Sequence, residues 1–284
     1  MIICVVGPTG VGKTKLSEVL ASKYNGIVVN ADAMQVYKEL NIGTAKITSE
    51  EMGQIPHFLF DIKNPDEDYS VYDYQSDLRN IIKSQADKNI IIVGGTGLYI
   101  KAGLYNYEFS EIKNKNEYTD YSNEELYSLI KQRGLEEEVH INNRKRMISK
   151  LNSSKNNNLK DELLYENVVF IGLTTSREIL YQKINDRVDK MMESGLLDEV
   201  SSLYKKYGNC KSLNTGIGYK ELIEYINGNI KLNDAIELIK KRSRRYAKRQ
   251  YTWFKNQMNV NWFTVDYDNF NKTIEDVLTY LDKS

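Results

Sequence analysis

Short continuous apolar runs recur along the chain, and amphipathic stretches lie between them. The runs stand at residues 2–6, 27–29, 58–60, 90–93 and 168–173, and a further strand is predicted near 260–265. Apolar side chains spaced three or four residues apart fill the intervals 13–24 and 71–87, which predicts helices there. Because a parallel strand buried on both faces carries an uninterrupted apolar run, the alternation predicts an α/β fold in which a parallel sheet has helices on both faces.

The pattern changes between residues 106 and 166, where Asn, Lys, Glu and Tyr dominate. Weak amphipathic stretches at 124–132 and 144–151 predict short helices in this region. We interpret it as a small helical insertion domain. The core domain is then formed by residues 1–105 together with 167–284.

Bulk composition limits the compartment and the kind of partner. The 284 residues carry 39 basic and 39 acidic side chains, so the net charge is zero and any nucleic-acid site must be a local basic patch. Two cysteines, Cys4 and Cys210, form neither a disulfide framework nor a metal-binding spacing, which is typical of a reducing cytosol. No apolar stretch approaches the roughly 18 residues that span a bilayer. We expect a cytoplasmic protein with no membrane segment, and we expect a monomer.

One segment near the start of the chain carries a strong phosphate-binding signal. The P-loop spacing G-x-x-x-x-G-K-T is met by Gly7, Pro8, Thr9, Gly10, Val11, Gly12, Lys13 and Thr14. An apolar run precedes this loop and a predicted helix follows it, so the backbone N–H groups and the positive end of the helix form a cradle for a diphosphate. An ordinary glycine turn with a helix cap does not account for both spacing and context. The loop therefore predicts a P-loop NTPase-like sheet and a diphosphate site, without requiring that ATP occupy it.

Polar residues follow the neighbouring apolar runs at the edge where open α/β sheets bind ligands. Asp32 follows the run 27–29, and it can accept a proton from a nucleophile or cap a helix over 33–38. Thr96 follows the run 90–93, and its hydroxyl can bind substrate or cap the next helix. Asp61 resembles the acid that orients Mg²⁺ through water in P-loop proteins, but we interpret it as a loop aspartate.

A long basic helix is predicted over residues 232–257. Within it, no acid interrupts the cations Lys240, Lys241, Arg242, Arg244, Arg245, Lys248, Arg249 and Lys255. Arg242, Arg245 and Arg249 would share one face of the helix. In a chain of zero net charge, so concentrated a stripe favours a phosphate-backbone contact over a solvated surface, which usually carries interspersed acids.

These motifs together resemble the tRNA dimethylallyltransferase family, also called tRNA isopentenyltransferase. Besides the P-loop, the matching stretches are D-x-M-Q-V-Y at 32–37, I-G-T-A-K at 42–46, G-G-T-G at 94–97, and A-K-R-Q-x-T-W at 247–253. The P-loop is common to many proteins, whereas D-x-M-Q-V-Y followed by I-G-T-A-K, together with A-K-R-Q-x-T-W, is specific to this family. The resemblance covers most of residues 1–105 and 168–255 and is thin between them.

The resemblance implies transfer of a dimethylallyl group from dimethylallyl diphosphate to N6 of the adenosine 3′ of the anticodon in tRNA, with release of diphosphate. The P-loop would hold the diphosphate, with Lys13 on its oxygens and Mg²⁺ on Thr14. Asp32 would be the general base, and Thr96 would lie near the reacting centre. Contacts to the anticodon stem-loop would come from Asp32, Ala33, Met34, Gln35, Thr96, Arg146, Arg245, Lys248 and Arg249.

The sequence departs from the family at two positions and leaves two other functions open. Ser149 stands where the family stretch has an arginine, and Thr215 lies where some relatives have an arginine that assists the diphosphate.

A small-molecule kinase would explain the P-loop and Asp32 but not the basic helix. A P-loop nucleotide switch would favour an aspartate after a long apolar strand, whereas the run 90–93 ends in Gly-Gly-Thr.

Overall fold

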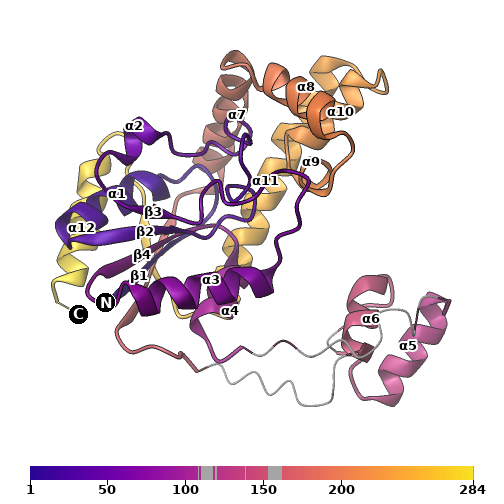
Figure 1. Ribbon diagram of the computed structural model, residues 1–284, viewed down its shortest axis with the longest axis horizontal. Coiled ribbons are helices and arrows are strands. Elements are labelled where there is room, and N and C mark those ends of the chain that lie inside the picture. Colours follow the sequence, from indigo (N-terminus) through magenta and orange to yellow (C-terminus); the bar gives the residue numbers. More distant parts are fainter. Residues whose placement is uncertain (108, 110–117, 119, 138, 153–161, 284) are drawn as a thin grey trace. The chain divides into compact units, whose positions relative to one another are not determined.

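The structure, a computed structural model, describes residues 1–107, 109, 118, 120–137, 139–152 and 162–283 (Figure 1). The chain divides into two compact units, one comprising Met1–Leu104 with Leu163–Ser284 and the other Tyr105–Glu162. Among the described residues, no helix has the length and apolar character needed to cross a membrane.

The first unit is built on a six-stranded sheet in which all neighbouring strands are parallel, in the order β3-β2-β4-β1-β5-β6. In chain order the strands are β1 (Ile2–Val6), β2 (Gly26–Asn30), β3 (His57–Phe58), β4 (Asn89–Gly94), β5 (Val168–Thr174) and β6 (Asn261–Thr264). The central strand β1 is buried along its whole length, and its Ile2 is in register with Ile90 on one side and Val168 on the other. The predicted parallel α/β sheet is confirmed.

Helices cover both faces of this sheet (Figure 1). The helices of this unit are α1 (Lys13–Lys23), α2 (Ser49–Met52), α3 (Val71–Ser84), α4 (Gly97–Leu104), α7 (Arg177–Glu193), α8 (Leu196–Tyr207), α9 (Lys211–Thr215), α10 (Tyr219–Ile226), α11 (Leu232–Gln257) and α12 (Phe270–Leu281). Of these, α8, α9 and α10 pack on α7, α11 and one another rather than on the sheet. Ile3 and Val5 belong to the buried cluster that takes in α1, α7, α11 and α12. Cys4 lies between them in sequence and faces Tyr74 of α3 on the other side of the sheet, as the period of two in a strand requires.

The chain leaves the predicted pattern at β3. The apolar run 58–60 predicted a strand over these residues, but β3 ends at Phe58. Leu59 and Asp61 have φ of 63° and 53°, a left-handed conformation that cannot continue a strand. The helix over 33–38 that Asp32 would have capped is also absent: residues 33–36 and 38–39 form turns, and Tyr37 makes an isolated bridge to Lys63.

The second unit contains α5 (Asn123–Gln132) and α6 (Arg144–Asn152). A capping box between Ser122 and Glu125 starts α5. The two helices pack through a small buried cluster that includes Leu126, Ile130 and Met147.

Candidate active site

The P-loop connects β1 to α1 at the carboxyl edge of the sheet. Its three glycines have positive φ, and Gly12 is the N-cap of α1, so the amides of the loop precede the positive end of a helix. Gly7, Pro8 and Val11 are buried and form the base of the loop. The other loop residues line a cavity of about 210 Å³, namely Thr9, Gly10, Gly12, Lys13 and Thr14.

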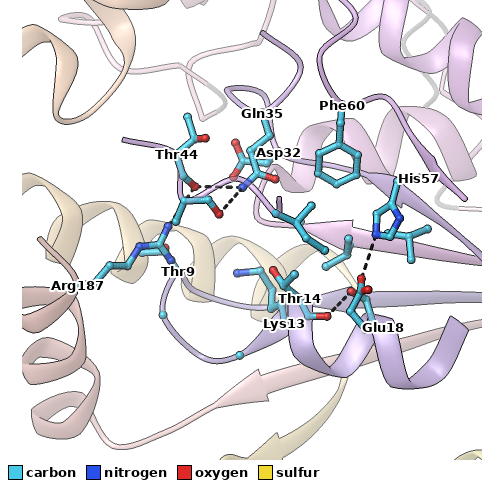
Figure 2. A pocket seen from close by; sticks show the side chains of 18 of the residues that line it. Thr9, Lys13, Thr14, Glu18, Asp32, Gln35, Thr44, His57, Phe60 and Arg187 are labelled. Atoms are coloured by element: carbon cyan, nitrogen blue, oxygen red, sulfur yellow. Dashed lines mark hydrogen bonds and ion pairs between the residues drawn. The ribbon is translucent and has the colours of Figure 1, made fainter. Parts of the chain in front are cut away.

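Two cations enter this cavity from different elements (Figure 2). Lys13 comes from the start of α1, and its Nζ donates to the Pro8 carbonyl at 2.8 Å. Burial lowers the pKa of Lys13 to about 8, the charge of Asp32 opposes this shift, and Arg187 adds to it. Arg187 comes from α7, and its guanidinium donates to the Thr44 carbonyl at 3.2 Å. The cavity therefore presents the positive charge that a diphosphate requires.

Arg187 is the residue of this cavity that the sequence reasoning missed. Burial lowers its pKa from the ordinary arginine value, and the charge of Asp32 counteracts the shift. A signal was present in the sequence, because Ile184 and Val188 are buried on the same side of α7 and Arg187 falls between them. A cation on the apolar stripe of an amphipathic helix indicates a buried functional charge, since a solvated arginine would lie on the opposite face.

The far end of the cavity is mainly apolar but contains one half-buried polar pair. Nε2 of His57 lies 3.0 Å from Oε1 of Glu18, and its Nδ1 lies 2.8 Å from the Ile55 carbonyl. Because a carbonyl only accepts, Nδ1 carries a proton, and a second proton is shared between Nε2 and the carboxylate. Val28, Ile47, Phe60 and Val93 form the apolar wall beside this pair.

Asp32 lies at the junction of this cavity with a second one of about 380 Å³. Its Oδ1 accepts from the Met34 amide at 2.9 Å, and its own amide donates to Oδ1 of Asn30 at 2.8 Å. These bonds hold the carboxylate in a turn without capping a helix. The second cavity continues past Ala33 and Met34 between α7, α10 and α11, where mainly apolar residues line it, and it takes in Arg249.

Thr96 supports the Asp32 turn and lines neither cavity. Its Oγ1 accepts from the Ala33 amide at 3.0 Å, and its amide donates to the Ala31 carbonyl at 3.0 Å. The hydroxyl is thus committed to the turn rather than to capping α4. Asp61 is turned to Lys46, whose Nζ also donates to the Tyr37 carbonyl, and it contributes to neither cavity.

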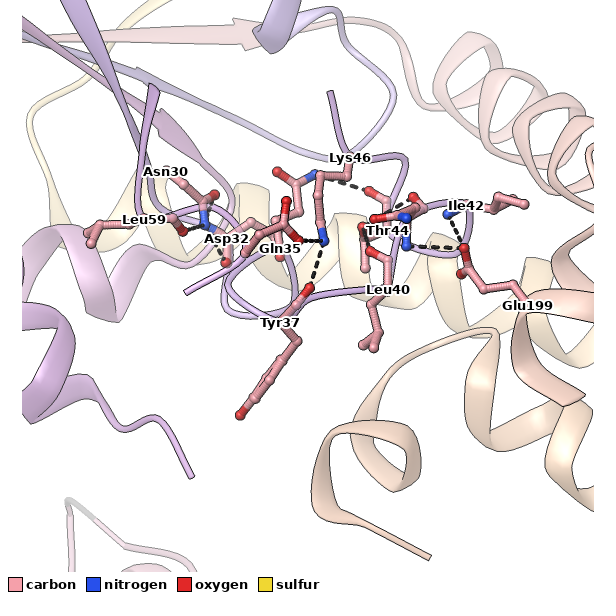
Figure 3. Close-up of polar contacts among 12 residues, drawn as sticks. Asn30, Asp32, Gln35, Tyr37, Leu40, Ile42, Thr44, Lys46, Leu59 and Glu199 are labelled. Atoms are coloured by element: carbon pink, nitrogen blue, oxygen red, sulfur yellow. Dashed lines mark hydrogen bonds and ion pairs between the residues drawn. The ribbon is translucent and has the colours of Figure 1, made fainter. Parts of the chain in front are cut away.

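The I-G-T-A-K stretch forms a loop that a single carboxylate holds (Figure 3). Glu199 of α8 accepts from the amides of Asn41, Ile42 and Gly43 at 3.1, 2.7 and 3.1 Å, and from the Tyr219 hydroxyl at 2.7 Å. The next residue in this loop is Thr44, whose carbonyl receives both Nε2 of Gln35 at 3.1 Å and Arg187. Gln35 and Arg187 both line the first cavity, so the Thr44 carbonyl holds two of the side chains in its wall.

The cations of α11 fall into two groups. Lys240 pairs with Asp189 and Arg242 with the buried Glu221, while Arg244 donates to Asn185. Five others are exposed and form no ion pair with a described residue: Lys241, Arg245, Lys248, Arg249 and Lys255. Arg249 lies over the Tyr246 ring at the second cavity. The predicted stripe is therefore free only in part, because tertiary partners hold Lys240, Arg242 and Arg244.

Arg146 lies on α6 of the second unit, where it is exposed. Ser149 is exposed on the same helix. Thr215 lines the second cavity, and its hydroxyl donates to the Lys211 carbonyl at 2.9 Å. The first cavity contains Arg187 in addition to Lys13, so it has an arginine although Thr215 stands at the family's arginine position.

Comparison with known proteins assigns this arrangement to a family. The profile of the family described as IPP transferase matches residues 35–257. The tRNA dimethylallyltransferases of Anoxybacillus flavithermus and Bacillus licheniformis are 45% and 43% identical to the chain, over 99% of it and 96% of each relative. The chain belongs to the tRNA dimethylallyltransferase family.

Solved structures agree with that assignment. The tRNA isopentenylpyrophosphate transferase of Staphylococcus epidermidis is 39% identical, with a TM-score of 0.77 over 99% of this chain and 98% of that one. A eukaryotic dimethylallyltransferase acting on tRNA is 28% identical, with a TM-score of 0.85 over 98% of this chain and 77% of the other. Membership of the tRNA dimethylallyltransferase family decides against the kinase and the nucleotide switch that the P-loop left open.

Proposed function

We propose that the protein transfers the dimethylallyl group of dimethylallyl diphosphate to N6 of the adenosine 3′ of the anticodon in tRNA, releasing diphosphate. The observation that carries the proposal is the place of Asp32. Its carboxylate lies where a cavity walled by the P-loop, Lys13 and Arg187 meets a cavity walled mainly by apolar side chains. Such a junction suits a base that acts between a charged leaving group and an aromatic nucleophile.

The first cavity has the properties of a diphosphate site. Loop amides, Lys13 and Arg187 can neutralise the charge that develops on oxygen as the C1–O bond of the substrate breaks. The apolar wall at 28, 47, 60 and 93 gives the five-carbon group a surface from which water is excluded. Exclusion of water matters because an allylic electrophile would otherwise be hydrolysed.

Thr14 is the residue that fits a magnesium ion. It is exposed at the cavity, and the described residues hold no cluster of three acidic, histidine or cysteine ligands. Magnesium is commonly bound by few protein groups together with phosphate oxygens and water, which suits one hydroxyl beside a diphosphate. When bound, the ion would supply further stabilisation of the charge on the leaving diphosphate.

The second cavity has the properties of a base pocket. A base in the anticodon loop can enter it only by leaving its stack, and apolar walls then hold its faces. N6 of adenine is a weak nucleophile because its lone pair is delocalised into the ring. As N6 bonds to C1, the electron pair of the C1–O bond passes to diphosphate and a proton of N6 passes to Asp32. Arg245, Lys248 and Arg249 on α11, and Arg146 on α6, are proposed to contact the RNA backbone.

The test is conversion of a transcribed tRNA by the purified protein with Mg²⁺ and dimethylallyl diphosphate, followed by digestion and mass spectrometry. We expect N6-dimethylallyladenosine at the position 3′ of the anticodon. The matched control is the same transcript with guanosine at that position, which should gain nothing. An unmodified cognate tRNA, together with ATP-dependent phosphorylation of a small molecule, would contradict the proposal.

A further inference from the structure

Gln250 of the A-K-R-Q-x-T-W stretch is a buried polar residue that the reaction so far leaves without a role. Its side chain is 5% exposed and lies at the first cavity. Oε1 accepts from the Thr9 amide of the P-loop at 3.0 Å, and Nε2 donates to the Gly95 carbonyl at 3.1 Å. A single amide group on α11 therefore bridges the loop after β1 to the turn after β4.

The orientation of this amide group is fixed by its partners. The backbone N–H of Thr9 can only donate and the Gly95 carbonyl can only accept. Rotating the Gln250 amide by half a turn would therefore place two donors together at one end and two acceptors together at the other. Both bonds lie in a largely buried setting, where an unmatched polar group is costly. Gln250 thus holds the P-loop and the Gly95 turn at one separation.

The glycines of the G-G-T-G turn show that the turn and α11 fit closely. A Cβ on Gly95 would overlap Nε2 of Gln250, and a Cβ on Gly97 would overlap the Trp253 ring. The glycines therefore allow the helix to approach the turn, and two stretches that are about 150 residues apart in the sequence form one contact.

The same contact reaches the Asp32 turn through Thr96. The residue after Gly95 is Thr96, whose hydroxyl holds the Ala33 amide next to Asp32. One helical turn before Gln250, the Tyr246 hydroxyl lies close to the Thr96 and Gln250 side chains. Burial raises the pKa of Tyr246 to about 12, so its hydroxyl stays protonated. Three loops, from β1, β2 and β4, thus meet on one face of α11.

We propose that Gln250 is a positioning residue for the transfer, and this inference rests on the function proposed above. By fixing Thr9 and Gly95 it sets the distance between the diphosphate cradle and the Asp32 carboxylate. It acts through these groups and does not touch the reacting atoms. Since the exposed cations Arg245, Lys248 and Arg249 lie on the same helix, the surface proposed to receive tRNA and the loops that hold the reactants form one rigid assembly.

The test is Gln250→Met, which keeps the length of the side chain and removes both hydrogen bonds. The matched control is Gln257→Met on the same helix, where the side chain is exposed and accepts from Lys101 at 3.3 Å. We expect the single-turnover rate at saturating tRNA and dimethylallyl diphosphate to fall on the order of 100-fold in Gln250→Met. The Kd for tRNA should stay within about twofold of the wild type, because the exposed cations are retained, and Gln257→Met should behave as the wild type.

A second variant separates positioning from simple loss of stability. Gly95→Ala places a methyl group against the Gln250 amide and should slow the same step. Because both changes break one contact, Gln250→Met and Gly95→Ala together should be little slower than the slower single variant. Independent damage would make the two losses multiply, and that result would overturn the inference.

The inference also fails if Gln250→Met retains the wild-type rate, or if its loss disappears once the rate is corrected for the folded fraction measured by circular dichroism. It fails too if tRNA binding falls as much as the rate. The wild type in the same assay tests the proposed function itself. An inactive wild type would overturn that function, whereas an active wild type with an equally active Gln250→Met would overturn the inference alone.

Discussion

The two cavities meet at Asp32 but are built in different ways. The first has the P-loop with Lys13 as its charged end, gains a second cation from Arg187, and is completed by an apolar wall from other segments. The second is assembled from segments far apart in the chain, including the turn at Ala33 and Met34, α7, α10 and α11, and is mainly apolar. Four residues line both: Thr9, Asp32, Thr44 and Arg187.

The difference shows how one site can handle two unlike reactants. A diphosphate can be held by charge and by backbone amides, which a short motif supplies. A flipped base is held by shape, which several elements must build together. Only the junction needs to serve both, and the shared residues supply an acid, a cation and two threonines there. Variants should therefore affect one cavity, the other, or both, according to where they lie.

The largest effect should come from the junction. Asp32→Ala removes the group proposed to accept the N6 proton, so we expect the single-turnover rate to fall by about 100- to 10,000-fold. Binding of tRNA and of dimethylallyl diphosphate should persist, because the walls of both cavities remain. Asp66→Ala is the matched control, since Asp66 is an exposed loop aspartate. Full activity in Asp32→Ala would show that Asp32 is not the base. The meeting of the two cavities at Asp32 would then have no part in the reaction.

The two cavities also differ in how well the sequence predicted them. The P-loop, β1 and α11 were predicted with the bounds that the structure has, because apolar periodicity and glycine spacing are local signals. The apolar stripe of α7 marks Arg187 as a buried cation, but the cavity that Arg187 enters and the partners of Gln250 were not predicted, because both depend on which distant segments meet. The same limit applies to α11. Arg242 and Arg245 were predicted to share one face, yet Glu221 binds only Arg242. β3 was wrong beyond Phe58 because apolar content says nothing of the positive φ at Leu59 and Asp61.

An intermediate effect should appear on the diphosphate side as a pH dependence. Burial lowers the pKa of Lys13 to about 8 in the free protein. A bound diphosphate favours the charged amine and so raises that pKa. Above about pH 8, binding must take up a proton, and the affinity for inorganic diphosphate should fall by up to about tenfold per pH unit. Below that pH the amine is already charged and the dependence should level off.

Calorimetry at pH 8.5 in two buffers of different ionisation enthalpy measures this uptake directly. The Lys13→Met variant should bind diphosphate more weakly and without the uptake of this proton. Binding of tRNA to the wild type should show no matching change near pH 8, since Lys13 lies on the diphosphate side. Equal proton uptake in the wild type and in Lys13→Met would assign the titration to another group.

The smallest effect should come from the rim of the base cavity, where α11 offers its own matched pair of variants. Arg245→Gln with Arg249→Gln removes two exposed cations, and Lys240→Gln with Arg244→Gln removes two that have protein partners. If the exposed pair contacts phosphates, the first double variant should reduce the slope of log Kd against log salt for tRNA by roughly 1 to 2, because each lost contact retains its counterion. The second should leave the slope near that of the wild type, since its cations already have partners within the protein. Equal slopes for the two double variants would mean that net charge alone attracts the RNA, and the division of α11 into held and free cations would then have no bearing on binding.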